Sequence, residues 1–211
     1  MMSELNALKD VLMHKTAQKG LIALYANSQK ECTRNGTCGM EIGMAREKDM
    51  CAVLKLHLGD AISLDIDNTL PEDFLLHEQK VSIKHSQAKI GSPVKAKWTS
   101  ADKSVQEAIT FMIDAADDYY PHLLLVYMDI KSKKITICCI SSEHNRTTIK
   151  GLGKSAFKVP TGNSRGIEYS TAAMKELMRQ CYFVVEITDA DLTGGMDPIE
   201  RRMKELSLID L

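Results

Sequence analysis

The sequence DFLLHEQKVSIK, from Asp73 to Lys84, predicts the β-hairpin around which the rest of the fold is arranged. Two short apolar arms flank a polar stretch, HEQK, that has the composition of a turn. If His77 faces Lys80 across this turn, Asp73 lies opposite Lys84, with both side chains on one face and their Cβ atoms about 5 Å apart. A slip of one residue would break that pairing.

A helix is expected before the hairpin, from about Met44 to Leu58. At helical spacing Glu47 shares a face with an apolar stripe, whose members are Met50, Cys51, Leu54 and Leu58. A carboxylate in line with an apolar stripe is unusual, so Glu47 is a candidate functional residue.

Helices, strands and turn-rich connections are expected along the rest of the chain. Helices are expected from Ser3 through Leu12, through Leu21 and Leu24, over 99–116 with Thr99 or Ser100 as the cap, over 170–180, and after Asp197. Strands are expected over 62–66, 122–130, 135–141 and 182–187, with loops over 30–39 and from 144 to 166. This order indicates an α/β fold, a mixed sheet flanked by helices, in one domain over residues 1–211.

Composition is that of an ordinary globular protein: 211 residues, 44% hydrophobic and 26% charged. No apolar run approaches the roughly 20 residues that span a bilayer, and the first residues lack a signal peptide's basic start and apolar centre. No membrane partner is therefore expected, and a cytoplasmic location is predicted. The six cysteines are expected to be reduced thiols, because the chain is long and no signal peptide is recognised; a zinc ribbon is not expected either, because no CxxC pair offers zinc spacing.

The net charge of −1 conceals two basic strips, residues 79–101 and 144–166. Each strip holds five lysines or arginines and no acidic residue, so the remainder of the chain carries −11. A solvated basic loop would explain either strip alone. Two such strips in a near-neutral protein favour a polyanionic partner, nucleic acid in particular.

Asp73, Lys84 and Glu47 together form a candidate catalytic site. Two carboxylates suit Mg²⁺, because hard oxygen ligands hold this cation, which neutralises the charge that develops during phosphodiester hydrolysis. The lysine ammonium would orient or activate the attacking water. From the spacing alone, a purely structural ion pair between Asp73 and Lys84 is the commoner case, and this alternative stays open.

The run VSIKHSQAKIGSPVKAKWTSADKSVQEAI, residues 81–109, resembles the catalytic strand and following helix of type II restriction endonucleases with the PD-(D/E)XK fold. Within that superfamily, Glu on a helix, Asp on a strand and Lys eleven residues later resemble the ThaI family. The resemblance implies a homodimer that cuts both strands of the palindrome CGCG to blunt ends with Mg²⁺, and a cognate DNA methyltransferase as a separate protein. By position it makes Glu47 and Asp73 the metal ligands and Lys84 the catalytic lysine.

The sequence departs from the superfamily pattern at Ser82, where an acidic residue usually stands two positions before the lysine. Glu47 would supply the missing carboxylate from its helix. A literal (D/E)XK occurs as Glu78-Gln79-Lys80, but it falls in the expected turn and is interpreted as incidental.

Candidate contacts to double-stranded DNA come from the basic strips: Lys89, Lys95, Lys97, Arg146, Lys150, Lys154, Lys158 and Arg165. Met40 is a further candidate, as a wedge that enters the base stack from the minor groove. It follows Gly39 in a turn-rich loop and stands seven residues before Glu47. Packing beneath that loop is the alternative for Met40.

Two other functions stay open. The stretch ISLDIDNTL, residues 62–70, resembles the DxDxT motif of haloacid-dehalogenase-type phosphatases, with Asp65 as nucleophile and Asp67 as acid/base. That motif requires a doubly wound parallel sheet, which the expected hairpins oppose. A non-catalytic DNA-binding protein with the same basic strips is the third possibility.

Overall fold

The computed structural model of the chain describes residues 2–36, 39–66, 71–98, 104–129, 132, 134–160 and 166–188, except for the side chains of residues 2, 3, 39 and 40. Asp67, Arg165 and the helix expected after Asp197 lie outside the described residues.

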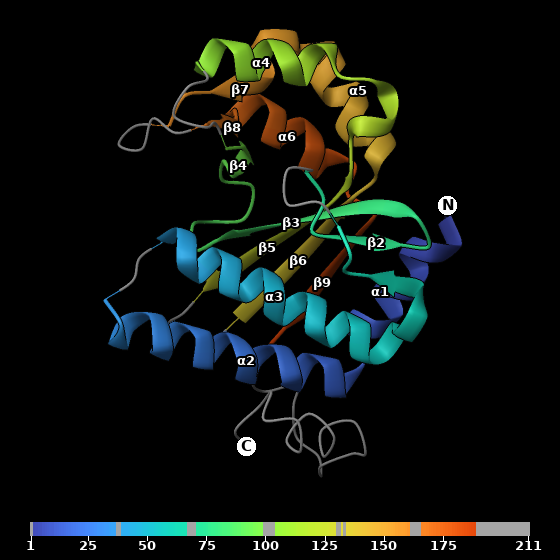
Figure 1. Cartoon of the computed structure of the whole chain (residues 1–211), viewed down its shortest axis with the longest axis vertical. Coiled ribbons are helices and arrows are strands. Elements are labelled where there is room, and N and C mark those ends of the chain that lie inside the picture. Colours follow the sequence, from blue (N-terminus) through green and yellow to red (C-terminus); the bar gives the residue numbers. More distant parts are fainter. Residues whose placement is uncertain are drawn as a thin grey trace.

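A six-stranded mixed sheet runs through the molecule in the order β1-β2-β3-β5-β6-β9 (Figure 1). Its strands are β1 (Ile62–Ser63), β2 (Phe74–Leu76), β3 (Gln79–Ser86), β5 (His122–Asp129), β6 (Lys134–Ile140) and β9 (Phe183–Ile187). β3 and β5 are parallel, and the other neighbouring pairs of this sheet are antiparallel. The central strand β5 is buried along HLLLVYM, as expected for a strand covered on both faces.

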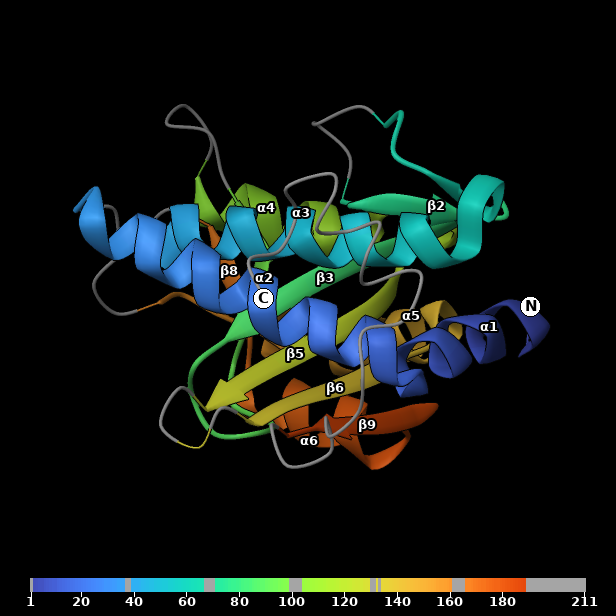
Figure 2. The ribbon, with the colours of Figure 1, turned by 90° about the horizontal axis from the view of Figure 1, so that it is seen from below.

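Helices cover both faces of this sheet (Figure 2). One layer contains α1 (Met2–Met13), α2 (Lys15–Arg34) and α3 (Gly39–Leu58). The other contains α4 (Val105–Asp114), α5 (Ser142–Leu152) and α6 (Thr171–Arg179), with a small sheet of β4 (Lys95–Lys97), β8 (Ile167–Tyr169) and β7 (Phe157–Lys158). Short 3₁₀ helices follow several elements: η1 (Gly59–Ala61), η2 (Asp117–Tyr119) and η3 (Gly153–Ala156). The predicted α/β fold with a mixed sheet between helices is confirmed.

Alternation along the strands gives each helical layer its own core. Val81 and Ile83 of β3 pack on the side of α1, α2 and α3. Lys84 is in register with Leu125 of β5, which packs on the side of α4, α5 and α6. Lys84 therefore points to that second side, whereas the next residue, His85, points to the first.

The hairpin has a different register from the one expected. Leu76 pairs with Gln79, so the turn consists of only two residues, His77 and Glu78. Both take positive φ, 44° and 68°, as in the primed turns that match the twist of antiparallel strands. Glu78 therefore lies in the turn as predicted, whereas Gln79 and Lys80 of the literal (D/E)XK are the first residues of β3.

This register carries Asp73 to a position opposite Ser82, two residues from the expected partner. The predicted direct pairing of Asp73 with Lys84 is thus wrong. A shift of two residues preserves the face of every side chain, so the two remain diagonal neighbours on one face of the hairpin.

Several predicted boundaries are also wrong. The strand over 62–66 is confined to β1, α2 and α3 extend into the expected loop over 30–39, and the basic loop from 144 begins as helix α5. Capping explains two of the helix starts. Ser104 caps α4 in a reciprocal capping box with Glu107, and Ser141 caps α5; the expected caps, Thr99 and Ser100, lie outside the described residues.

Within the part of the chain that the structure describes, no helix combines the length and apolarity that crossing a membrane requires.

The double substitution His77→Asn/Glu78→Gly should raise the free energy of unfolding by about 1 kcal/mol, because Asn and Gly take positive φ with less strain. Urea-induced unfolding measures the change, and the slope with denaturant should stay constant. Lower stability in the double variant would contradict the two-residue turn.

Candidate active site

Asp73 directly precedes β2 and forms hydrogen bonds with β3 through both its backbone and its side chain. Its N–H donates to the Val81 carbonyl at 2.8 Å, and its Oδ2 accepts hydrogen bonds from the Ile83 N–H at 2.6 Å and from Ser82 Oγ at 3.0 Å. The carboxylate thus accepts the hydrogen bond that a carbonyl of a neighbouring strand would otherwise accept from Ile83. This bond fixes the Asp73 side chain relative to β3. Within the described part of the chain, Oδ1 of Asp73 accepts no hydrogen bond and is available to a ligand.

Lys84 lies beside this carboxylate, with Nζ 3.9 Å from Oδ2 of Asp73. The two side chains are 21% and 23% exposed, so the ion pair is partly buried yet reachable by a ligand. Ser82, which stands where the superfamily usually has an acid, donates its hydroxyl to Asp73 instead of supplying a second carboxylate.

Glu47 reaches the same place from α3, which packs against β3. Burial raises the pKa of Glu47 to about 7; the negative charge of Asp73 also raises it, and the Lys84 ammonium lowers it. These couplings show that the three charges lie within electrostatic range of one another. The structure therefore brings together the three residues that the sequence selected.

Cys51, one turn after Glu47, gives an independent measure of how closely α3 approaches Asp73. Its Sγ lies 3.8 Å from the Asp73 carbonyl oxygen. Burial, together with the charges of Asp73 and Glu47, raises the pKa of the Cys51 thiol to about 12. The thiol therefore stays protonated near neutral pH and acts as a weak donor rather than as a nucleophile.

The donor set fits a hard divalent cation. Asp73 and Glu47 present carboxylate oxygens; burial, and then the charge of Asp73, raise the pKa of Glu47, and a bound cation would favour the charged form of both groups. Among the described residues, no three His, Cys, Asp or Glu side chains are grouped as metal ligands. Mg²⁺ commonly uses only one or two carboxylates and completes its shell with water and substrate phosphate, so a two-carboxylate site is sufficient.

The two basic strips meet on the small sheet. Lys95 of the first strip and Lys158 of the second both face Glu168 of β8, at 3.8 and 3.3 Å. Gly166 permits this meeting, because it has φ +95° and an added Cβ would lie 2.2 Å from the Lys97 carbonyl oxygen. Residues that are far apart in sequence thus form one basic surface with a shared acidic partner.

Two other predicted DNA contacts lie over aromatic rings. The ammonium of Lys97 is 4.8 Å from the ring centre of Phe111, and that of Lys150 is 5.6 Å from the ring centre of Tyr120. The same ammonium groups donate hydrogen bonds, Lys97 to the Tyr119 hydroxyl at 3.2 Å and Lys150 to the Ala115 carbonyl at 2.9 Å.

The other predicted DNA contacts differ in whether an acidic side chain pairs with them. Arg146 forms an ion pair with Asp117 at 2.5 Å. Lys89 and Lys154 are exposed and form no ion pair with any described residue. Met40 belongs to the first turn of α3, but its side chain is outside the described part, so its proposed wedge is untested.

Sequence reasoning missed a buried polar group beneath the site. Arg46 of α3 is only 2% exposed, and Tyr25 of α2 is fully buried. The ring of His85 faces Tyr25. A signal was present in α2, where Tyr25, Ser28 and Gln29 recur at helical spacing on one face.

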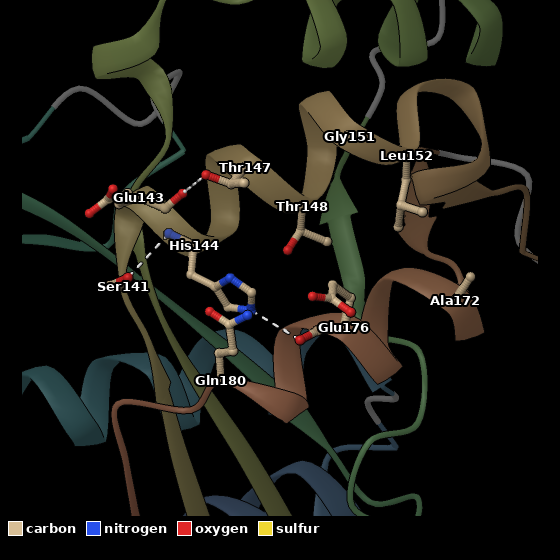
Figure 3. A pocket seen from close by; sticks show the side chains of 10 residues that line it. All are labelled: Ser141, Glu143, His144, Thr147, Thr148, Gly151, Leu152, Ala172, Glu176 and Gln180. Atoms are coloured by element: carbon tan, nitrogen blue, oxygen red, sulfur yellow. Dashed lines mark hydrogen bonds between the residues drawn. The ribbon is translucent and has the colours of Figure 1, made fainter.

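A hollow of about 640 Å³ lies between α5 and α6 (Figure 3). It contains none of the three site residues; its lining is Ser141, Glu143, His144, Thr147, Thr148, Gly151, Leu152, Ala172, Glu176 and Gln180. His144 is held there by its backbone N–H, which donates to Ser141 Oγ, and by its Nε2, 3.0 Å from the Glu176 carbonyl. This histidine is thus bound to the fold, and no general base or metal ligand set emerges among these residues.

The phosphatase alternative is wrong on topology. β1 is an edge strand, antiparallel to β2, whereas the DxDxT motif must end a central parallel strand. Asp65 is exposed beyond β1.

The chain is similar to restriction endonucleases. A family model described as "Restriction endonuclease ThaI" matches residues 7–188. A solved structure described as "Restriction endonuclease in complex with substrate DNA" has a TM-score of 0.68 and 25% sequence identity, covering 95% of this chain and 98% of that chain. No curated protein gives a significant match.

Without added metal, the raised pKa of Glu47 should make the folded protein less stable as pH rises. A carboxyl whose pKa is about 7 when folded and 4.5 as a model value stabilises the fold below pH 4.5 and loses that contribution through pH 7. Glu47→Gln should therefore become more stable relative to wild type over this interval, by about 3 kcal/mol at pH 8.

Urea unfolding between pH 4.5 and 8 measures this difference. Glu78→Gln is the control, because it removes a carboxylate from the exposed turn. A difference between Glu47→Gln and wild type that is constant with pH would contradict the electrostatic origin.

Proposed function

The chain belongs to the ThaI restriction endonuclease family, and on that premise we propose that it is a type II enzyme that hydrolyses phosphodiester bonds in both strands of a short palindromic DNA site with Mg²⁺. The observation that supports this proposal most directly is the proximity of Asp73 and Lys84 on the β2–β3 hairpin, with Glu47 of α3 within electrostatic range of both. By the same resemblance the proposed target is CGCG, cut to blunt ends.

Asp73 and Glu47 are the proposed metal ligands. Asp73 is held by hydrogen bonds from Ile83 and Ser82 to its Oδ2, so Oδ1 has a defined direction. When bound, Mg²⁺ would supply positive charge that neutralises the developing charge on the scissile phosphate. The raised pKa of Glu47 implies that this carboxyl must lose its proton before it serves as a ligand.

Lys84 is the proposed catalytic lysine. Its ammonium is 3.9 Å from Oδ2 of Asp73, the proposed metal ligand. This distance is that of an ion pair and is too long for a hydrogen bond. From there it orients the attacking water and stabilises negative charge on the phosphate oxygens. The partial exposure of Lys84 and Asp73 leaves room for a DNA strand to approach both groups.

Double-stranded DNA is the proposed substrate, and a homodimer is the proposed active form. Cleavage of both strands of a two-fold symmetric site requires two equivalent active sites, which a symmetric pair of single-domain chains provides. We place the enzyme in the cytoplasm, where a separate cognate DNA methyltransferase would protect the host's own sites.

Lys89, Lys95, Lys97, Arg146, Lys150, Lys154, Lys158 and Arg165 are the proposed backbone contacts. Lys154 is favoured because it is exposed and forms no ion pair within the described part of the chain. Met40 is the proposed wedge, since it stands two turns before Glu47 on a helix that leads to the site.

Incubation of the protein with plasmid DNA and Mg²⁺ tests the function itself. Discrete, reproducible fragments would support a site-specific nuclease. Binding without cleavage at any divalent metal concentration would favour a non-catalytic DNA-binding protein instead, and would overturn the proposal.

Asp73→Asn and Lys84→Ala should each reduce the cleavage rate by at least about 10³-fold while leaving DNA affinity nearly unchanged. Asparagine keeps the shape that accepts the Ile83 N–H but removes the charge on a metal ligand. Glu47→Gln should be similarly inactive. Single-turnover cleavage and gel-shift titrations in Ca²⁺ separate the two effects.

Glu78→Gln and Asp65→Asn are the matched controls, because each neutralises an exposed carboxylate outside the site and should keep near wild-type activity. If Lys84→Ala folds and still cuts at the wild-type rate, the assignment of the catalytic lysine fails.

Lys154→Ala should weaken binding to all DNA sequences and reduce the slope of log K against log salt by about one unit. Lys158→Ala should have a smaller effect on the slope, because Lys158 already pairs with Glu168 at 3.3 Å. Fluorescence anisotropy at several salt concentrations measures both slopes. Unchanged slopes in both variants would show that this surface lies away from DNA.

A further inference from the structure

Three polar side chains on one face of α2 hold the two elements that carry the proposed catalytic groups. They are Tyr25, Ser28 and Gln29, which recur at helical spacing; Tyr25 and Ser28 are buried, and Gln29 is partly exposed. Ser28 Oγ donates to Asp49 of α3 at 2.6 Å, so one of these contacts ties α2 to α3 directly. The other two reach residues adjacent in sequence to Glu47 and Lys84.

Tyr25 contacts β3 through the residue that follows the catalytic lysine. Its hydroxyl lies 2.9 Å from Nε2 of His85, and the two rings meet edge to face with centroids 5.3 Å apart. Strand alternation places Lys84 and His85 on opposite faces of β3. The contact therefore fixes β3 from behind while Lys84 projects into the site.

The same tyrosine contacts α3 through the residue that precedes Glu47. The guanidinium of Arg46, which is only 2% exposed, lies 6.0 Å from the ring centre of Tyr25. Nη2 of Arg46 also donates to Oε1 of Gln29 at 2.6 Å, and Gln87, just after β3, donates to the same oxygen at 3.3 Å. Tyr25 and Gln29 thus each touch both α3 and the chain of β3.

Burial makes these contacts specific. Tyr25 is fully buried, and its pKa lies well above the usual value because of desolvation, so its hydroxyl keeps its proton. A buried hydroxyl that loses its partner costs free energy, because no water replaces the hydrogen bond. Other conformations in which the Tyr25 hydroxyl loses its partner are therefore higher in free energy.

We infer that Tyr25 is a positioning residue for DNA cleavage: by contacting His85 and Arg46 it fixes the separation between Lys84 on β3 and Glu47 on α3. This inference rests on the proposed function. It assigns a role in the reaction to a side chain on the far side of the site, which touches neither metal nor substrate. A relative displacement of about 1 Å between catalytic groups is enough to cost roughly 10²-fold in rate.

Tyr25→Phe tests the inference, because it removes the hydroxyl and keeps the ring. The matched control is Tyr169→Phe, a 2% exposed tyrosine in the other core whose hydroxyl donates to Asn145 at 3.0 Å. Both variants lose one buried hydrogen bond and should lose similar amounts of thermal stability. Only Tyr25→Phe should lower kcat, by roughly tenfold to 10²-fold, with KM for DNA within about twofold of wild type.

A second readout follows the metal site without activity. Mn²⁺ binding measured by electron paramagnetic resonance should weaken by roughly tenfold in Tyr25→Phe and stay unchanged in Tyr169→Phe, because support residues orient the metal ligands. His85→Leu should reproduce the fall in kcat, and Tyr25→Phe/His85→Leu should lower kcat no further than either single change. Such non-additivity identifies one shared interaction.

The inference is overturned if Tyr25→Phe lowers kcat no more than Tyr169→Phe does, or if the Tyr25 and His85 changes are additive. Failure of the wild-type protein to cleave DNA with Mg²⁺ is a separate outcome, which overturns the proposed function and with it this inference.

Discussion

The hydrogen bonds that the Asp73 carboxylate accepts from β3 are the constraint on which the rest of the site depends. With Oδ2 bound to the Ile83 N–H and Ser82 Oγ, the side chain extends the strand ladder beyond the point where β2 begins. The β2–β3 hairpin alone holds Lys84 and Asp73 close together, because it contains both residues. Only Glu47 must be brought in by tertiary packing.

The packing of α3 against β3 places the Glu47 carboxylate near that of Asp73, where burial and charge repulsion disfavour its ionised form. Glu47 is half-buried near Asp73, and its pKa is raised to about 7 by desolvation and by that neighbouring charge. Strain of this kind is characteristic of functional sites, where an arrangement that disfavours the free protein favours a bound ligand. The α2 contacts to Arg46 and His85 supply the rigidity that holds α3 and β3 in this unfavourable relation.

The sequence was sufficient for the elements with strong periodicity, and it selected Asp73 and Lys84, which form an ion pair, but it did not indicate contacts between distant segments. The hairpin, β5, β6 and α6 lie within one or two residues of their expected positions, and the error of two residues in the hairpin register left the faces unchanged. Helix α5 was missed because its sequence, SEHNRTTIKGL, has few apolar residues, and its start depends on the Ser141 cap. Nothing local to Tyr25 indicated that its partners lie on α3 and β3.

The basic strips show how tertiary structure modifies a charge pattern read along the chain. Lys95 and Lys158 come from different strips and share Glu168, so one carboxylate lies between two ammonium groups. Partly exposed ion pairs of this length are worth little, about 1 kcal/mol or less, and yield readily to a phosphate. An acid placed between two lysines therefore holds them at fixed positions in the free protein and leaves their charge available to a polyanion. A near-neutral protein can in this way present a basic surface without the self-repulsion that ten uncompensated charges would impose.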